Sequence, residues 1–378
     1  MKYKPDWEDA MIRLSALWNG QPTDRPCIAV IAPSDRAPAA SLESAPAPAT
    51  PEERWLAPEC VVPQAVATIS SQWWGGEAAP SFLLMAGWVV SIGGKPRFDH
   101  GTIWFEQQKP DFDRPPPFRH DPQDNFVRRF EKLYVALADA AGWDDFMVGS
   151  PCLLPANDLI SMHMGPENFL VALMDEPEWM LDAITTGAAE LIRARRHFRT
   201  LVEKRHRFWY GNAGWMPFWA PEPFAGLQSD VSCMISPELF DRFVVPEIEL
   251  WSREIGAVWY HLDGGDARQH LPRLLSLACV RVIQYTPAPS EPPNGPAHME
   301  FYRRIQEAGK IVHIQLDASN VEPLCRELDP SRLMLHVACR NPSEGRELLA
   351  SARRWCSARA GRRPGAEKPC VCRTQTSG

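Results

Sequence analysis

Short apolar segments alternate with helix-like segments along most of this 378-residue chain, and this alternation limits the folds that the chain can form. Strand-like segments begin at residues 27, 82, 146, 208, 258, 280, 310 and 332. In the second half of the chain, each strand-like segment is followed by a helix-like one. Short apolar strands separated by helices are typical of right-handed βαβ units around a parallel sheet.

Eight such units predict the α/β class and a closed (β/α)₈ barrel of the TIM type. A helix over residues 6–18 precedes the first strand, and stretches rich in Ala and Pro predict long loops between the first strands. We expect one barrel domain over residues 1–356 and a disordered tail over residues 357–378, where apolar residues are few. A doubly wound open sheet is the main alternative, and it also binds ligands at the carboxyl ends of its strands.

The composition argues against several classes of protein. A formal net charge of -7 without a basic stripe does not favour a nucleic-acid partner. No apolar run approaches the roughly 20 residues of a membrane helix, and the polar N-terminus does not resemble a signal peptide. Ten cysteines without a disulfide-like rhythm predict reduced thiols in the cytoplasm, and we assign no role to Cys370 and Cys372 in the tail. A homodimer is compatible with the sequence, which does not fix the oligomeric state.

The stretch from Trp259 to Asp266 (WYHLDGGD) carries the strongest candidate site. His261 and Asp263 lie two positions apart at the end of a predicted strand, so their side chains leave the same face. Cys339 ends the last predicted strand, and the strand tips of such a barrel converge on one cavity. An imidazole, a carboxylate and a thiolate can all bind zinc, and a catalytic zinc keeps one position open. A His261–Asp263 pair that binds an organic substrate, with Cys339 as a small buried apolar residue, is the simpler alternative.

Other residues at or near the predicted strand tips are candidates for substrate binding. They are Arg36, Trp88, Asn212, Trp215, Gln284 and Arg340. Asp230, in a loop before a predicted helix, is a candidate general acid, a residue that orients the metal ligands, or a fourth ligand. His313 and His336 alternate with apolar neighbours inside strands, and we expect both to be hydrogen-bonded core residues. For each tryptophan taken singly, ordinary packing in the core is at least as good an explanation as a place in the wall of a ligand pocket.

Several of these stretches resemble the uroporphyrinogen decarboxylase superfamily. The likeness lies in residues 24–30 (DRPCIAV), 228–247, 259–264 (WYHLDG) and 335–345 (LHVACRNPSEG), and it extends over the chain up to about residue 356. It implies the same (β/α)₈ barrel. The superfamily includes methyltransferases that move methyl groups between a corrinoid carrier and a thiol.

The two branches of this superfamily imply different sites. The decarboxylases bind a polycarboxylate through an arginine-rich segment of the type R-Q-A-G-R, whereas this chain has only Arg25 and Arg36 in that region. The thiol methyltransferases build a zinc site from an H-x-C sequence and a distant cysteine. Here His261 matches the histidine, Asp263 stands in place of the first cysteine, and Cys339 matches the second. Because a carboxylate donates less electron density than a thiolate, we expect a thiol bound at such a zinc to be a poorer nucleophile.

The resemblance therefore implies a methyltransferase in which zinc activates a thiol-type acceptor. The methyl group would come from a partner corrinoid protein or a small methyl donor, and the substrate itself is not identified. A metal-free decarboxylase or lyase is the alternative, with Asp230 or Asp263 as the proton donor and Arg36 or Arg340 holding a substrate carboxylate. A barrel that binds a tetrapyrrole, a corrinoid or a peptide without converting it is the third hypothesis.

Overall fold

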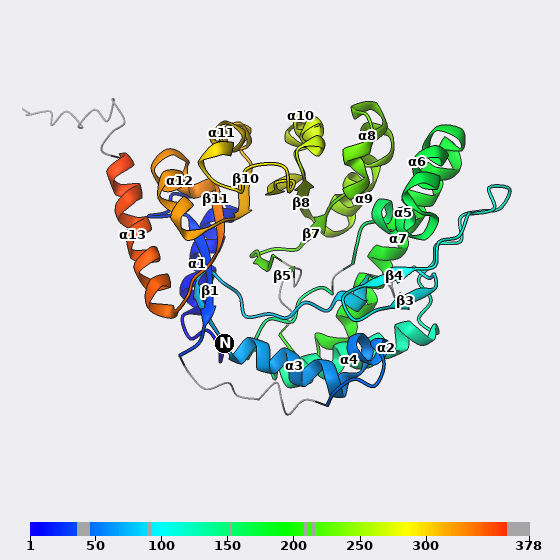
Figure 1. Ribbon diagram of the computed structural model, residues 1–378, viewed down its shortest axis with the longest axis horizontal. Helices are drawn as coiled ribbons and strands as arrows, with labels where there is room; N and C mark the ends of the chain where they lie inside the picture. The colour runs from blue at the N-terminus through cyan, green and yellow to red at the C-terminus, as the bar shows by residue number, and fades with distance from the viewer. Residues whose placement is uncertain (36–45, 89–91, 152, 208–210, 213–215, 361–378) are drawn as a thin grey trace, which may run out of the picture.

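The protein is described by a computed structural model that covers residues 1–35, 46–88, 92–151, 153–207, 211–212 and 216–360. Helices lie around the outside of the molecule, and the strands lie towards its middle (Figure 1). Among the described residues, no helix combines the length and the apolar character needed to cross a bilayer.

One seven-stranded sheet carries the candidate site. In spatial order its strands are β2 (Gln72–Gly76), β1 (Cys27–Pro33), β11 (Leu333–Ala338), β10 (Ile311–Gln315), β9 (Val280–Thr286), β8 (Ala257–Asp263) and β7 (Phe224–Leu227). In this spatial order, each of the strands β1, β11, β10, β9, β8 and β7 is parallel to its neighbour. The edge strand β2 pairs with β1 in the antiparallel sense. The carboxyl ends of the parallel strands therefore meet at one edge of the sheet, where polar residues such as His261 and Asp263 come together.

Helices connect the parallel strands. α8 (Pro237–Phe243) and α9 (Val245–Ile255) lie between β7 and β8, and α10 (Leu271–Ser276), α11 (Met299–Glu307) and α12 (Val321–Glu327) precede β9, β10 and β11. α1 (Trp7–Trp18) precedes β1, and α13 (Pro342–Ala360) follows β11. Ser236 caps α8, because its side chain accepts a hydrogen bond from the Leu239 amide. α13 continues past residue 357, where we predicted the tail to begin, and residues 361–378 lie outside the described residues.

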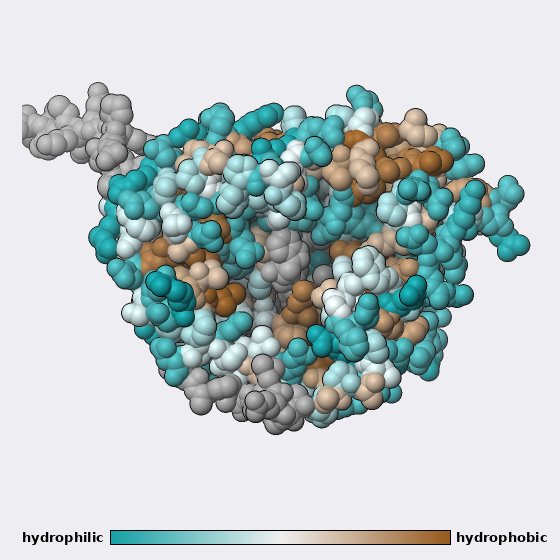
Figure 2. Space-filling model, in the orientation of Figure 1, coloured by the Kyte–Doolittle hydropathy of each residue, from teal (hydrophilic) through white to brown (hydrophobic). Residues whose placement is uncertain are grey.

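The first half of the chain contributes mostly helices and two short hairpins. The helices are α2 (Pro51–Leu56), α3 (Pro58–Ser70), α4 (Asn125–Ala140), α5 (Ala156–Met164), α6 (Pro166–Asp175) and α7 (Pro177–Val202). The hairpins are β3 (Pro96–Phe98) with β4 (Ile103–Phe105), and β5 (Gly211–Asn212) with β6 (Phe218–Trp219). The long helix α7 contacts α4, α5 and α9, so it joins this half to the sheet. The face seen in Figure 2 is largely hydrophilic, with apolar patches near α6 and α8, and Val171 and Met174 of α6 are exposed.

The predicted core histidines are confirmed. His313 and His336 are buried, and the Trp259 indole nitrogen donates a hydrogen bond of 2.9 Å to Nδ1 of His313. Nε2 of His313 then carries the proton and faces Nδ1 of His336 at 3.3 Å. The parallel strands are apolar on both faces because they are covered on both sides, which is why they read as continuous apolar runs.

The α/β class is confirmed, but closure into an eight-stranded barrel is not, because the sheet formed by the described residues ends at β2 and β7. Five predicted strands are confirmed, those at 27, 258, 280, 310 and 332. In place of the predicted strands at 82 and 146, the described residues have an isolated parallel bridge between Ser81 and Met147 and a further bridge residue at Ser150. Residues 208–210 lie outside the described residues. On the side of β8 away from β9, the neighbouring strand is β7. We did not predict β7, because Pro221, Pro223 and Gly226 interrupt its apolar run.

Candidate metal and substrate site

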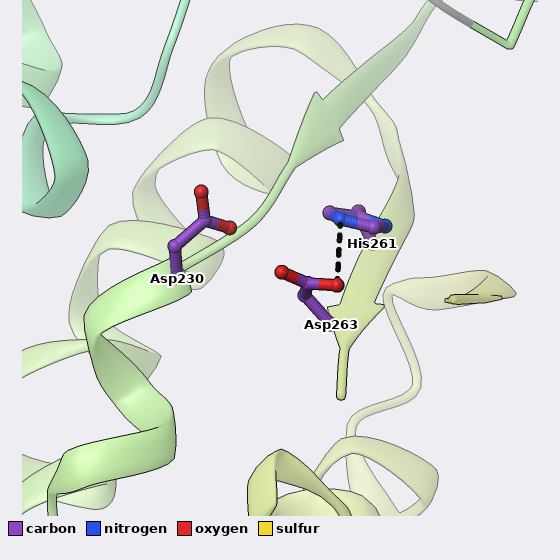
Figure 3. A group of neighbouring side chains, drawn as sticks. All are labelled: Asp230, His261 and Asp263. Atoms are coloured by element: carbon purple, nitrogen blue, oxygen red, sulfur yellow. Dashed lines mark ion pairs between the residues drawn. The ribbon is translucent and has the colours of Figure 1, made fainter. Parts of the chain in front are cut away.

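Three side chains gather at the carboxyl end of β8. His261 and Asp263 come from β8, and Asp230 begins the 3₁₀ helix η3 (Asp230–Met234) that follows β7 (Figure 3). Each residue offers one ligand atom, and these atoms all lie within 4.8 Å of one another. Nε2 of His261 lies 4.0 Å from Oδ1 of Asp263. The predicted convergence of His261 and Asp263 on one face is thus confirmed, and Asp230 completes the group.

His261 is held in place by Gln284, which lies directly opposite it in the β8–β9 register. The amide nitrogen of Gln284 donates to Oγ1 of Thr286 at 3.1 Å, so its Oε1 faces Nδ1 of His261 and accepts a hydrogen bond from it. This bond leaves the lone pair of Nε2 on the side of Asp263. Burial lowers the pKa of His261, and the neutral imidazole is the form that binds a metal.

Asp230 belongs to a network of acidic groups. Its backbone amide donates to Oδ1 of Asp158 at 2.8 Å. The Gln228 amide nitrogen donates both to Oδ2 of Asp158, at 2.8 Å, and to Oδ1 of Asp230, at 3.0 Å. Asp230 stays accessible, yet the loss of water around its carboxyl group, followed by the charges of Asp158 and Asp263, raises its pKa to about 8. Burial is also the main cause that raises the pKa of Asp158 to about 6.

Asp158 is positioned by the start of α5. The buried Glu247 carboxylate of α9 accepts hydrogen bonds from the amides of Ala156, at 2.6 Å, and Asn157, at 3.1 Å. Glu247 also accepts from the Asn157 side chain at 2.7 Å. A carboxylate that binds the free N–H groups of a first turn stabilises the helix, so Glu247 fixes the turn that carries Asp158.

A cavity of about 400 Å³ reaches this group. Asp230 and His261 line it on the polar side, and most of the remaining lining is apolar. The described lining residues are Leu83, Met85, Trp88, Ser150, Pro151, Leu153, Leu154, Pro155, Arg195, Phe224, Gly226, Leu227, Gln228, Asp230, Trp251, Trp259 and His261. Its volume lies within the range of about 300–1,000 Å³ that is typical of small-molecule sites.

Cys339 does not take the place that the sequence suggested. Among the described residues, the ligand atoms that gather within 4.8 Å come from Asp230, His261 and Asp263 and do not include the Cys339 thiol. Cys339 follows β11, which is separated from β8 by β9 and β10. This is three strand spacings, about 14 Å measured along the sheet. We therefore replace Cys339 by Asp230 in the candidate ligand set.

The predicted substrate-binding residues differ in where the structure places them. Trp88 lines the cavity, whereas Gln284 is buried behind His261 and orients it. Arg340 is exposed, pairs with Glu344 and is not among the described lining residues. Arg36 and Trp215 lie outside the described residues. Asn212 belongs to β5, and only its backbone is described.

Three residues that line or shape the site have no role in the predictions from the sequence, namely Asp158, Gln228 and Arg195. Asp158 and Gln228 carry no periodic signal, since their roles depend on contacts between α5 and the segment that follows β7. Arg195 does carry one, because it occupies a core-facing position of α7 between the buried Leu191 and Phe198. A charged residue in an apolar helical stripe can be recognised from spacing.

No protein-family model and no curated protein sequence matches this chain. Among solved structures, the chain is similar to a methyltransferase from Methanosarcina mazei, at 11% sequence identity and a TM-score of 0.55. The superposition covers 91% of this chain and 98% of the other. Such a similarity supports a shared fold. The relationship to the uroporphyrinogen decarboxylase superfamily stays a prediction from the sequence.

Proposed function

We propose that this protein is a metal-dependent enzyme of the methyltransferase type, with Asp230, His261 and Asp263 as the ligands of a zinc ion. The observation that carries the proposal is the convergence of three ligand atoms within 4.8 Å beside a largely apolar cavity. The reaction class is taken by analogy from the methyltransferase that shares this fold, because a fold by itself does not fix a function.

The donor set fits a divalent cation. Two carboxylates and a neutral imidazole are acceptable ligands for zinc, and three protein ligands leave a position for a substrate. The pKa of Asp230 is raised first because its carboxyl group loses water and second because Asp158 and Asp263 add negative charge beside it. A cation would relieve the repulsion among Asp158, Asp230 and Asp263 and hold Asp230 in its ionised form.

When bound, the cation would lower the pKa of a thiol or related acceptor and make it a stronger nucleophile at neutral pH. The protein's own residues orient the metal ligands and line the cavity. Gln284 fixes the ring of His261, Gln228 holds Asp230 against Asp158, and the apolar lining around Trp88 and Trp259 excludes water. In the transfer itself, the acceptor sulfur loses its proton and gains the methyl group, and the donor keeps the electron pair of the broken bond. A partner corrinoid protein or a small molecule would be the methyl donor.

Metal binding is the direct test. We expect chelator-treated protein to take up about one equivalent of Zn²⁺, measured by isothermal titration calorimetry and elemental analysis after dialysis. His261→Ala should weaken binding by about 100-fold or more, since changes to groups that only orient the ligands already cost 10–100-fold. His100→Ala is the matched control, because His100 is an exposed turn residue.

A melting experiment gives a second readout. Zinc at 100 times its Kd should stabilise the wild type by about 2.7 kcal/mol, which is about 3 °C for a chain of this length. A 100-fold weaker His261→Ala variant should gain only about 0.5 °C at the same zinc concentration. Equal zinc affinity of the two histidine variants, or no uptake by the wild type, would overturn the proposal.

A metal-free lyase or decarboxylase is the second candidate, and one observation favours it. A carboxyl group with a pKa of about 8 is protonated at neutral pH and can donate a proton to a carbanion-like centre in the cavity. Release of CO₂ from a panel of small carboxylic acids in the presence of EDTA, with loss of that activity in Asp230→Asn, would favour this reaction over methyl transfer.

A further inference from the structure

Arg195 is a cation on the core face of α7. Its helical neighbours on that face, Leu191, Phe198 and Val202, are all buried and apolar. The Arg195 side chain lines the same cavity as Asp230 and His261. An arginine at such a position is costly to bury unless something pairs with it.

The structure provides only a weak partner for this cation. Nη2 of Arg195 donates to the backbone carbonyl of Phe224 at 2.8 Å. Over the part of the chain that the structure describes, no carboxylate oxygen lies within 4.0 Å of this guanidinium. The neighbouring arginines of α7 differ, since Arg196 pairs with Glu254 at 2.8 Å and Arg199 pairs with Glu203 at 3.0 Å.

The charge of Arg195 persists at neutral pH. Burial lowers its pKa to about 10, which still leaves the guanidinium protonated. A guanidinium has five N–H donors in a planar fork, and the Phe224 carbonyl accepts from only one nitrogen. Donors therefore remain for a ligand, and a planar carboxylate matches the fork with two parallel hydrogen bonds.

We propose that Arg195 binds the carboxylate of an organic substrate whose apolar body fills the cavity. The acidic group of Asp158, Asp230 and Asp263 repels an anion, so the opposite charges of the two polar regions fix the direction in which the substrate enters. Leu154, Trp251 and Trp259 provide apolar contacts for its body. This orientation rests on the proposed function, because it presents the other end of the substrate to the metal site. The binding of an anion by Arg195 does not depend on the proposed function.

Binding of model carboxylates tests the proposal. The probes are phenyl-substituted monocarboxylates from benzoate to 5-phenylpentanoate, each paired with its primary amide, titrated calorimetrically into the full chain with EDTA present so that no metal can bind the anion. We expect at least one carboxylate to bind more tightly than its amide. Arg195→Met should weaken that carboxylate by about 10- to 100-fold and leave the amide unchanged. Arg196→Met is the matched control, since Arg196 is exposed and paired with Glu254.

Folding and metal binding are checked separately. Methionine fills similar space without a buried charge, so Arg195→Met should melt at or above the wild-type temperature. If it does not fold, Arg195→Lys keeps the charge but loses the planar fork, and it should show intermediate carboxylate affinity. Arg195→Met should bind zinc as tightly as the wild type does, because Arg195 is not a metal ligand. If the wild type binds no zinc, the proposed function is wrong, but the role of Arg195 in carboxylate binding is unaffected. Carboxylates that bind no better than their amides, or equally well to wild type and Arg195→Met, would overturn the role of Arg195.

Discussion

Asp158→Asn should change how the stability of the protein depends on pH. Asp158 is buried, and burial raises its pKa from 3.8 to about 6. Because one pKa unit corresponds to about 1.36 kcal/mol, the ionised form of Asp158 costs about 3 kcal/mol of folding free energy. A carboxyl with a raised pKa contributes its full stability below the unfolded pKa of 3.8 and loses it as the pH rises through about 6. About 2 kcal/mol of this loss falls between pH 4.5 and pH 7.5.

The assay is equilibrium urea denaturation of metal-free protein at these two pH values. We expect the wild type to lose about 2 kcal/mol more than Asp158→Asn between pH 4.5 and pH 7.5. Removing the Asp158 charge also lowers the pKa of Asp230, which acts in the same direction. Any hydrogen bond to Gln228 that the Asp158→Asn variant loses changes its stability equally at both pH values. Substitution of the exposed Asp9 by Asn is the control. If the stabilities of wild type and Asp158→Asn fall in parallel between the two pH values, Asp158 is not the group that titrates.

Three further predictions concern ligand positioning, the ligand set and the framework. Gln284→Ala should lower zinc affinity by about 10- to 100-fold without removing a ligand, because His261 loses the acceptor that orients it; calorimetry showing wild-type affinity would contradict this. Cys339→Ser should keep wild-type zinc affinity, and a loss as large as that of His261→Ala would restore Cys339 to the ligand set. Glu77→Ala should destabilise the protein by about 3–5 kcal/mol in urea denaturation, since it leaves the buried Arg25 without its bidentate partner; a cost below about 1 kcal/mol would argue against the pair.

Local sequence patterns are enough to predict the class of the fold and two of the three candidate ligands, His261 and Asp263. Continuous apolar runs followed by helical patterns located five parallel strands, because burial on both faces of a parallel strand leaves a strong local signal. The two-residue spacing of His261 and Asp263 placed both side chains on one face, because the side-chain period of a strand is fixed by backbone geometry.

The third ligand and the other polar side of the cavity depend on contacts between distant elements. Asp230 joins His261 and Asp263 because η3 follows β7 after two residues and contacts β8, and no local pattern encodes that contact. Cys339 lies outside the group because the strand order inserts β9 and β10 between the two strand ends. Arg195 faces the cavity because α7 packs against α4, α5 and α9 with that stripe inward, and its guanidinium reaches the Phe224 carbonyl of β7. Periodicity shows which face of an element is buried, whereas contacts between distant elements depend on how the whole chain packs.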